Sequence, residues 1–241
     1  MEAIFRNKLV AYSGDIGKAR EAFCVDLVAK KQKIFEEFRA SQADIVARNS
    51  EAITCNKGCV GCCSAYMQAT IQECETIVWW LYRHEDILSD FLAAYPGWRQ
   101  KVRDGGDLFL KCGKLWQEKQ KHGTGTEAAA ASDSAEKTYL ALGIPCPFLK
   151  EDACSIYEIR PLVCAALAAT TPPEWCIPGT SNSAKMYVSS NPLMLDTSFY
   201  FNRLEGPVLA FMPMGVHGIL QDGYSFLSGI PGLEGLAEKT P

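Results

Sequence analysis

Large apolar residues recur at helical spacing in the N-terminal part of the chain. Between residues 16 and 45 they follow one another at alternating intervals of seven and four positions. They are Ile16, Phe23, Leu27, Ile34, Phe38 and Ile45. Because the positions between them are rich in Lys, Arg, Asp and Glu, the pattern predicts an amphipathic helix over residues 17–48.

A second helix has a clear start signal. Glu73 follows Thr70 by three positions, which is the signature of a capping box. The predicted helix that begins here has an apolar face formed by Ile71, Cys74, Val78 and Leu81. Shorter helices are expected over residues 86–95 and 97–121, with Gly123 ending the latter.

The rest of the chain has weaker patterns. Residues 122–134, HGTGTEAAAASDS, predict a flexible link, and a short helix is expected to follow and end near Leu142. Proline interrupts residues 146–176, so this region cannot be one helix. The elements expected beyond it are helices near 194–204 and 216–228 and a short strand at Met186–Ser189.

Composition narrows the class of protein. The 241 residues are 48% hydrophobic and 22% charged, which is typical of a globular chain. A net charge of −4 disfavours a nucleic-acid partner. No apolar run approaches the ~18 residues of a membrane span, so no membrane association is expected. The start, MEAIFRNKLV, is not a secretory signal, and a cytoplasmic location is therefore expected.

The chain contains 11 cysteines. In a reducing compartment, clustered cysteines favour metal ligation over disulfides. The segment CNKGCVGCC places Cys55, Cys59, Cys62 and Cys63 within nine residues. The glycines between them allow the backbone to curl around one centre, and zinc and iron both bind thiolates. The spacing of the first three also occurs in radical S-adenosylmethionine enzymes. Gly61 before the third cysteine and the absence of βα alternation disfavour that alternative.

A second group of cysteines follows much later in the chain. Cys146, Cys154 and Cys164 lie in CPFLKEDACSIYEIRPLVC, and Cys176 lies in WCIPG. These spacings are too long for one helical face, so the ligands are expected to come from loops. The fold predicted is mostly α: an irregular helical domain with long metal-bound cysteine loops. Its expected parts are an N-terminal helical segment (1–50), a cysteine-cluster domain (51–180) and a C-terminal extension packed on that domain (181–241).

The two groups together resemble a known family. The first group followed by CPFL, CSIYE and RPxxC is similar to the YkgJ-type cysteine-cluster (CxxCxxCC) proteins, which are described as zinc- or iron-chelating. The resemblance covers residues 55–176 and implies eight metal ligands. They are Cys55, Cys59, Cys62, Cys63, Cys146, Cys154, Cys164 and Cys176. Two departures are a first spacing of three residues instead of two, and Ala165 where the family commonly has Arg.

The metal and the role stay open at this stage. Cysteine-only ligation admits zinc and iron, and the compact first group favours an iron–sulfur cluster. One function class is a metal-binding module without catalysis. The other is a metal- or cluster-dependent enzyme for redox or methyl-transfer chemistry, since flagellin lysine methylases have a related cysteine arrangement. An enzyme needs a free coordination position beside a group such as Arg160 or His217.

Four residues outside this ligand set have alternative interpretations. Arg160 could donate to cluster sulfur or an anion, but a clamp onto Glu158 or the backbone is favoured. Cys24, Cys74 and Cys112 fall in helical patterns, and core packing is favoured over ligation for all three.

Overall fold

The computed structural model describes residues 2–123, 125–234 and 236, and it is mostly α-helical. The mostly α prediction is confirmed. The helices are α1 (Glu2–Ala11), α2 (Gly14–Asn49), α3 (Ile71–Leu81), α4 (Glu85–Asp104), α5 (Leu108–His122), α6 (Glu127–Ala141), α7 (Leu162–Ala166), α8 (Met212–Asp222) and α9 (Tyr224–Ser228). Short 3₁₀ turns, η1 (Gly61–Ser64), η2 (Pro173–Cys176) and η3 (Pro192–Leu195), lie in the loops.

The strands among the described residues are short and form antiparallel pairs. The pairs are β1 (Gln68–Thr70) with β8 (Leu209–Phe211), β2 (Leu149–Lys150) with β3 (Ala153–Cys154), β4 (Leu167–Ala169) with β5 (Met186–Val188), and β6 (Ser198–Phe199) with β7 (Asn202–Arg203). The β4–β5 pair confirms the short strand expected at Met186–Ser189. The β1–β8 pair joins the start of α3 to the start of α8, so distant parts of the chain meet at one place.

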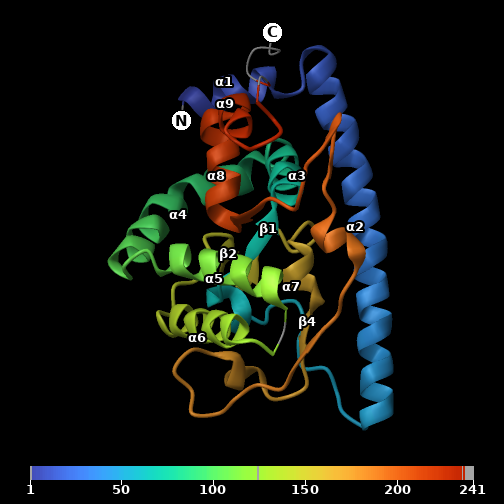
Figure 1. Ribbon diagram of the computed structural model, residues 1–241, viewed down its shortest axis with the longest axis vertical. Coiled ribbons are helices and arrows are strands. Elements are labelled where there is room, and N and C mark those ends of the chain that lie inside the picture. The colour runs from blue at the N-terminus through green and yellow to red at the C-terminus, as the bar shows by residue number, and fades with distance from the viewer. Residues whose placement is uncertain (1, 124, 235, 237–241) are drawn as a thin grey trace.

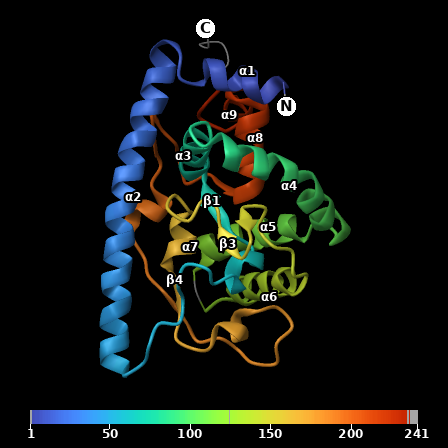
Figure 2. The same cartoon turned by 180° about the vertical axis from the view of Figure 1, so that it is seen from behind.

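Helix α2 runs along one side of the whole molecule (Figures 1 and 2). Helices α1, α8 and α9 gather at one end, and α5 and α6 lie toward the other (Figure 1). The main core draws buried side chains from Ile4 in α1 to Leu236. A second, smaller core lies between α2 and α7, where Phe35 and Phe38 pack with Leu162. Among the described residues, no helix combines the length and the apolar character needed to cross a membrane.

The long helix and the capping box are as predicted. Helix α2 covers the whole of the expected range. The Thr70 side chain accepts from the Glu73 N–H at 3.3 Å, and the Glu73 carboxylate accepts from the Thr70 N–H, also at 3.3 Å. Both bonds satisfy N–H groups that a helix start otherwise leaves without partners.

The prediction that one helix ends at residue 95 and the next begins at residue 97 is wrong. Helix α4 continues through Pro96 to Asp104 and is capped by Gly105, after which Gly106 and Asp107 have positive φ. Pro96 is exposed, and the stripe from Phe91 to Val102 is buried on both sides of it. Burial of this stripe outweighs the one backbone hydrogen bond that proline removes.

The prediction of a flexible link over residues 122–134 is also wrong for residues 127–134, which are helical. Helix α6 begins at Glu127, capped by the Thr126 side chain, which accepts from the Ala129 N–H at 3.2 Å. Alanine is the strongest helix former, and the small residues Ser132 and Ala135 are buried. The helix ends at Ala141, as expected for the segment leading to Leu142.

Two C-terminal expectations need correction. Residues 194–204 form the end of η3 and the β6–β7 hairpin instead of a helix. There the Asp196 carboxylate accepts from the Ser198 N–H at 2.7 Å, a local bond that competes with helix formation. The helix expected over 216–228 is two helices, α8 and α9, divided at Gly223, which has a φ of +53°.

Candidate metal centre

The eight predicted ligands lie on loops and short elements of the fold. Cys55 and Cys59 follow α2, and Gly58 between them has a φ of +99°, the left-handed conformation that glycine tolerates. The other six lie in or next to short elements: Cys62 and Cys63 in η1, Cys146 before β2, Cys154 in β3, Cys164 in α7 and Cys176 in η2. All 11 cysteines are free thiols.

Hydrogen bonds donated by main-chain N–H groups hold the two groups of cysteines together. The N–H of Cys146 donates to the Cys63 carbonyl at 2.8 Å. The N–H of Ala169 donates to the Cys55 Sγ at 3.0 Å. Next to this contact, the Thr54 N–H donates to the Ala169 carbonyl at 2.9 Å. Each group is therefore tied to the other at two places.

Seven of the eight cysteines line one cavity of about 220 Å³. They are Cys55, Cys59, Cys62, Cys63, Cys146, Cys154 and Cys164. Apolar side chains form other parts of the wall, including Trp98 from α4 and Phe211 from β8. Among the described residues, the lining contains no Asp, Glu or His, whereas it includes Arg39 and Arg160.

Cys176 is the one predicted ligand outside this lining. It lies against η1, where a Cβ added to Gly61 would come 2.4 Å from the Cys176 Cβ. Only glycine permits this approach without a shift of the backbone or of Cys176. Cys176 is thus adjacent to the first group of cysteines, although it does not face the cavity.

The thiols do not form a ready-made coordination sphere. Within the described parts of the chain, no three His, Cys, Asp or Glu side chains have the arrangement of a metal site. The loops that carry the cysteines are present as predicted, and their being metal-bound remains a prediction.

The electrostatics of the cavity disfavour the thiolate forms of its deeply buried cysteines. Burial, with a smaller contribution from neighbouring thiolates, raises the pKa of Cys164 well above its ordinary value and that of Cys146 to about 12. A hydrogen bond from Cys63 lowers the pKa of Cys62 to about 7, and Arg160 adds to this shift. A bound cation would favour the thiolate form, and the thiol protons would be released to solvent as it binds.

Arg160 is held mainly as a clamp. Its guanidinium donates to the Tyr157 carbonyl and lies 3.8 Å from the centre of the Tyr157 ring. This agrees with the backbone clamp favoured from the sequence. His217 does not line the cavity, and instead stacks on Tyr95 with ring centres 3.8 Å apart.

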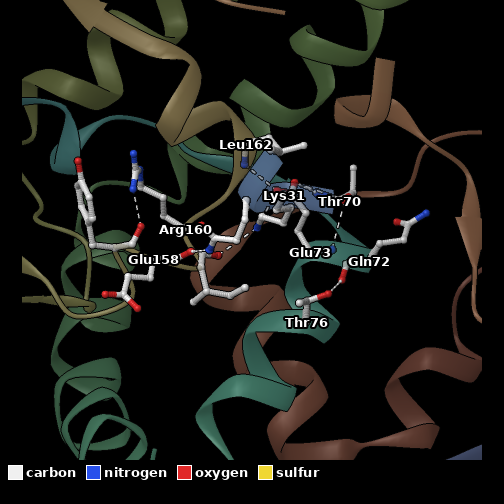
Figure 3. Close-up of polar contacts among 11 residues, drawn as sticks. Lys31, Thr70, Gln72, Glu73, Thr76, Glu158, Arg160 and Leu162 are labelled. Atoms are coloured by element: carbon white, nitrogen blue, oxygen red, sulfur yellow. Dashed lines mark hydrogen bonds and ion pairs between the residues drawn. The ribbon is translucent and has the colours of Figure 1, made fainter. Parts of the chain in front are cut away.

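Cys24, Cys74 and Cys112 are fully buried, as predicted for core residues. Two other buried residues near the site, Lys31 of α2 and Glu73 of α3, were not predicted as part of it; they contact Ile159 and Leu162, in the segment that leads to Cys164 (Figure 3). The sequence does indicate that Lys31 lies on the apolar face of the helix, since it comes four positions after Leu27 and three before Ile34.

A helical scaffold that gathers free cysteines from two distant segments around one cavity defines a cysteine-cluster protein. A model of the family described as "CxxCxxCC: putative zinc- or iron-chelating domain" matches residues 54–177. This is more than half of the chain, and the protein belongs to that family. The resemblance stated from the cysteine motifs is confirmed. No curated protein and no solved structure matches the chain.

The donor set fits the metals that the family description names. Free thiols from both groups converge on one cavity, and zinc and iron–sulfur clusters both accept ligand sets made only of cysteine. Thiolate chemistry by itself does not select between the two, because soft ligands suit both.

Proposed function

We propose that this protein is a metal-binding module that holds an iron–sulfur cluster or zinc through Cys55, Cys59, Cys62, Cys63, Cys146, Cys154, Cys164 and Cys176. The observation that carries the proposal is the shared cavity, into which both groups of cysteines are brought by the fold. At least one centre then takes ligands from both groups. Iron–sulfur is the favoured occupant, because the first group is compact and rich in glycine.

The cavity lining favours a binding module over an acid–base enzyme. A metalloenzyme of that kind needs general acid or base groups beside the metal. In the described lining no carboxylate or imidazole fills this role, and His217 lies elsewhere, stacked on Tyr95. The thiolate centre would supply electron transfer or structural stabilisation, and the surrounding residues would exclude water and hold the loops in place.

The test is metal analysis of the full-length protein. It would be purified without oxygen from cells supplied with iron and, separately, with zinc. We expect a brown protein with broad visible absorbance and stoichiometric iron and sulfide. A colourless protein with stoichiometric zinc would replace the iron proposal by zinc. A folded protein that binds neither metal would refute the proposed function.

A further inference from the structure

Lys31 of α2 is a fully buried lysine, with 0% of its surface exposed. Its ammonium donates to the Ile159 carbonyl at 3.0 Å and lies 3.3 Å from the Glu73 Oε1. A buried charge is costly unless it is paired and hydrogen-bonded, and these two contacts supply both requirements. Lys31 therefore occupies a place built for a cation.

Glu73 of α3 joins this lysine to Leu162, at the start of the helix that carries Cys164 (Figure 3). The Oε1 atom that faces Lys31 also accepts from the Leu162 N–H at 2.7 Å. Leu162 is the first residue of α7, which carries Cys164. The other carboxylate oxygen caps α3 through the Thr70 N–H. One side chain thus fixes the start of two helices relative to each other.

The segment leading to Cys164 is held at three points by α2 and α3. The Gln32 side chain donates to the Glu158 carbonyl at 2.8 Å, next to the bond from Lys31 to Ile159. The bond from Leu162 to Glu73 is the third point. Beyond it, the Cys164 N–H donates to the Pro161 carbonyl at 3.0 Å, so the turn of chain at Cys164 continues directly from the held segment.

Charge supports the same role. Burial lowers the pKa of Lys31, while the Glu73 carboxylate opposes this shift most strongly and Cys164 also opposes it. The lysine is therefore close enough to Cys164 to interact with its thiolate. Because Glu73 already neutralises Lys31, the coupling indicates that the pair lies beside Cys164, and the pair adds no net charge to the site.

We propose that Lys31 and Glu73 are positioning residues of the metal centre, which fix residues 158–162 so that the Cys164 thiol faces the cavity. This inference rests on the proposed function. It makes helix α2 part of the site, although α2 lies outside the residues 54–177 that the family model matches.

The chain contains a matched control pair. Arg20 and Glu75 also join α2 to α3, are equally buried, and form hydrogen bonds of 2.6 and 2.9 Å. Arg20 also donates to the Ala11 carbonyl at 3.2 Å, at the end of α1. This pair has the same chemistry as Lys31 and Glu73 but holds α1 instead of the Cys164 segment.

The experiment compares two double variants of the full-length protein, Lys31→Met with Glu73→Gln and Arg20→Met with Glu75→Gln. Removing both charges of a pair avoids the unpaired buried charge that could prevent a single variant from folding. Metal affinity is measured by chelator competition with Zn²⁺. Thiol accessibility is measured in the metal-free proteins as the rate of Cys164 alkylation, followed by peptide mass spectrometry.

We expect the Lys31/Glu73 variant to bind Zn²⁺ about 10- to 100-fold more weakly, the range found when residues that orient metal ligands are changed. Its Cys164 should alkylate faster. The Arg20/Glu75 variant should match the wild type in both measurements. Equal effects of the two variants, or none from Lys31/Glu73, would overturn the positioning role. Failure of the wild type to bind metal would refute the proposed function instead, and the alkylation rates would still decide the role of Lys31 and Glu73.

Discussion

The backbone N–H of Cys146 donates to the carbonyl oxygen of Cys63 at 2.8 Å, although the two residues belong to different cysteine groups far apart in the sequence. The bond joins main-chain atoms, so it does not depend on what the sulfurs bind. The two groups are therefore brought together by the fold itself, and a metal would bind to loops that are already neighbours.

Serine substitutions should divide the cysteines into two classes. Cys62→Ser and Cys154→Ser should each lower metal content and thermal stability, because binding free energy at a thiolate site is also folding free energy. Cys112→Ser should keep the metal and cost about 1–3 kcal/mol for a buried hydroxyl. Metal analysis and thermal unfolding of the three variants test this. Equal metal loss in all three would show that the ligand set is wrong.

Gly61→Ala should disturb the contact between η1 and η2. The added Cβ would lie 2.4 Å from the Cys176 Cβ, so one of the two turns must move and the metal affinity should fall. Gly97→Ala is the control, because nothing lies within 4 Å of a Cβ at that position in α4. It should raise stability by about 0.5–1 kcal/mol and leave metal binding unchanged. If Gly61→Ala binds metal with normal affinity, the proposal that Cys176 is a metal ligand would be contradicted.

The thiols of the metal-free protein should react with iodoacetamide in a defined order. Since the thiolate is the nucleophile, the rate at Cys62 should rise as the pH passes its lowered pKa of about 7. Cys146, with its pKa raised to about 12 by burial, should stay protonated and slow across neutral pH. Peptide mapping between about pH 5 and 9 measures both rates. Faster labelling of Cys146 than of Cys62 at neutral pH would contradict this order.

Pro96→Ala should stabilise the protein. The new N–H can complete the helical hydrogen bond that proline lacks, and the exposed position loses no packing. The expected gain is about 1–3 kcal/mol in the free energy of unfolding, with metal content unchanged. Denaturant unfolding of both proteins would measure it. A loss of stability would mean that α4 needs the proline at this point.

The sequence predicts those features that follow from local rules. The capping box of Thr70 and Glu73 and the apolar stripe of α2 depend only on neighbours along one helix, so they could be found without the structure. The family resemblance also follows from residues that lie in order along the chain. These features identify the cysteines that meet at the cavity, but they do not show how the cysteines are held.

Features that depend on tertiary contacts could not be predicted in the same way. The spacing of Lys31 places it on the apolar face of α2, but buried charges are rare. Only the partners Glu73 and Glu75 on α3 make the burial of Lys31 and Arg20 possible. Helix α4 continues past Pro96 because of buried residues on both sides, and packing of this kind is visible only in the folded chain.

The cavity wall has a consequence for how members of this family differ. The cysteines come from residues 54–177, but Phe35 and Arg39 of α2 and Phe211 and Met212 near the C-terminal end belong to flanking segments outside that range. A relative with the same cysteines and other flanks would enclose the same thiols in a space of different size, polarity and charge. The shared motif would then supply the same thiol ligands, and the flanks would set the solvent access and redox potential of the bound centre and which molecules can approach it.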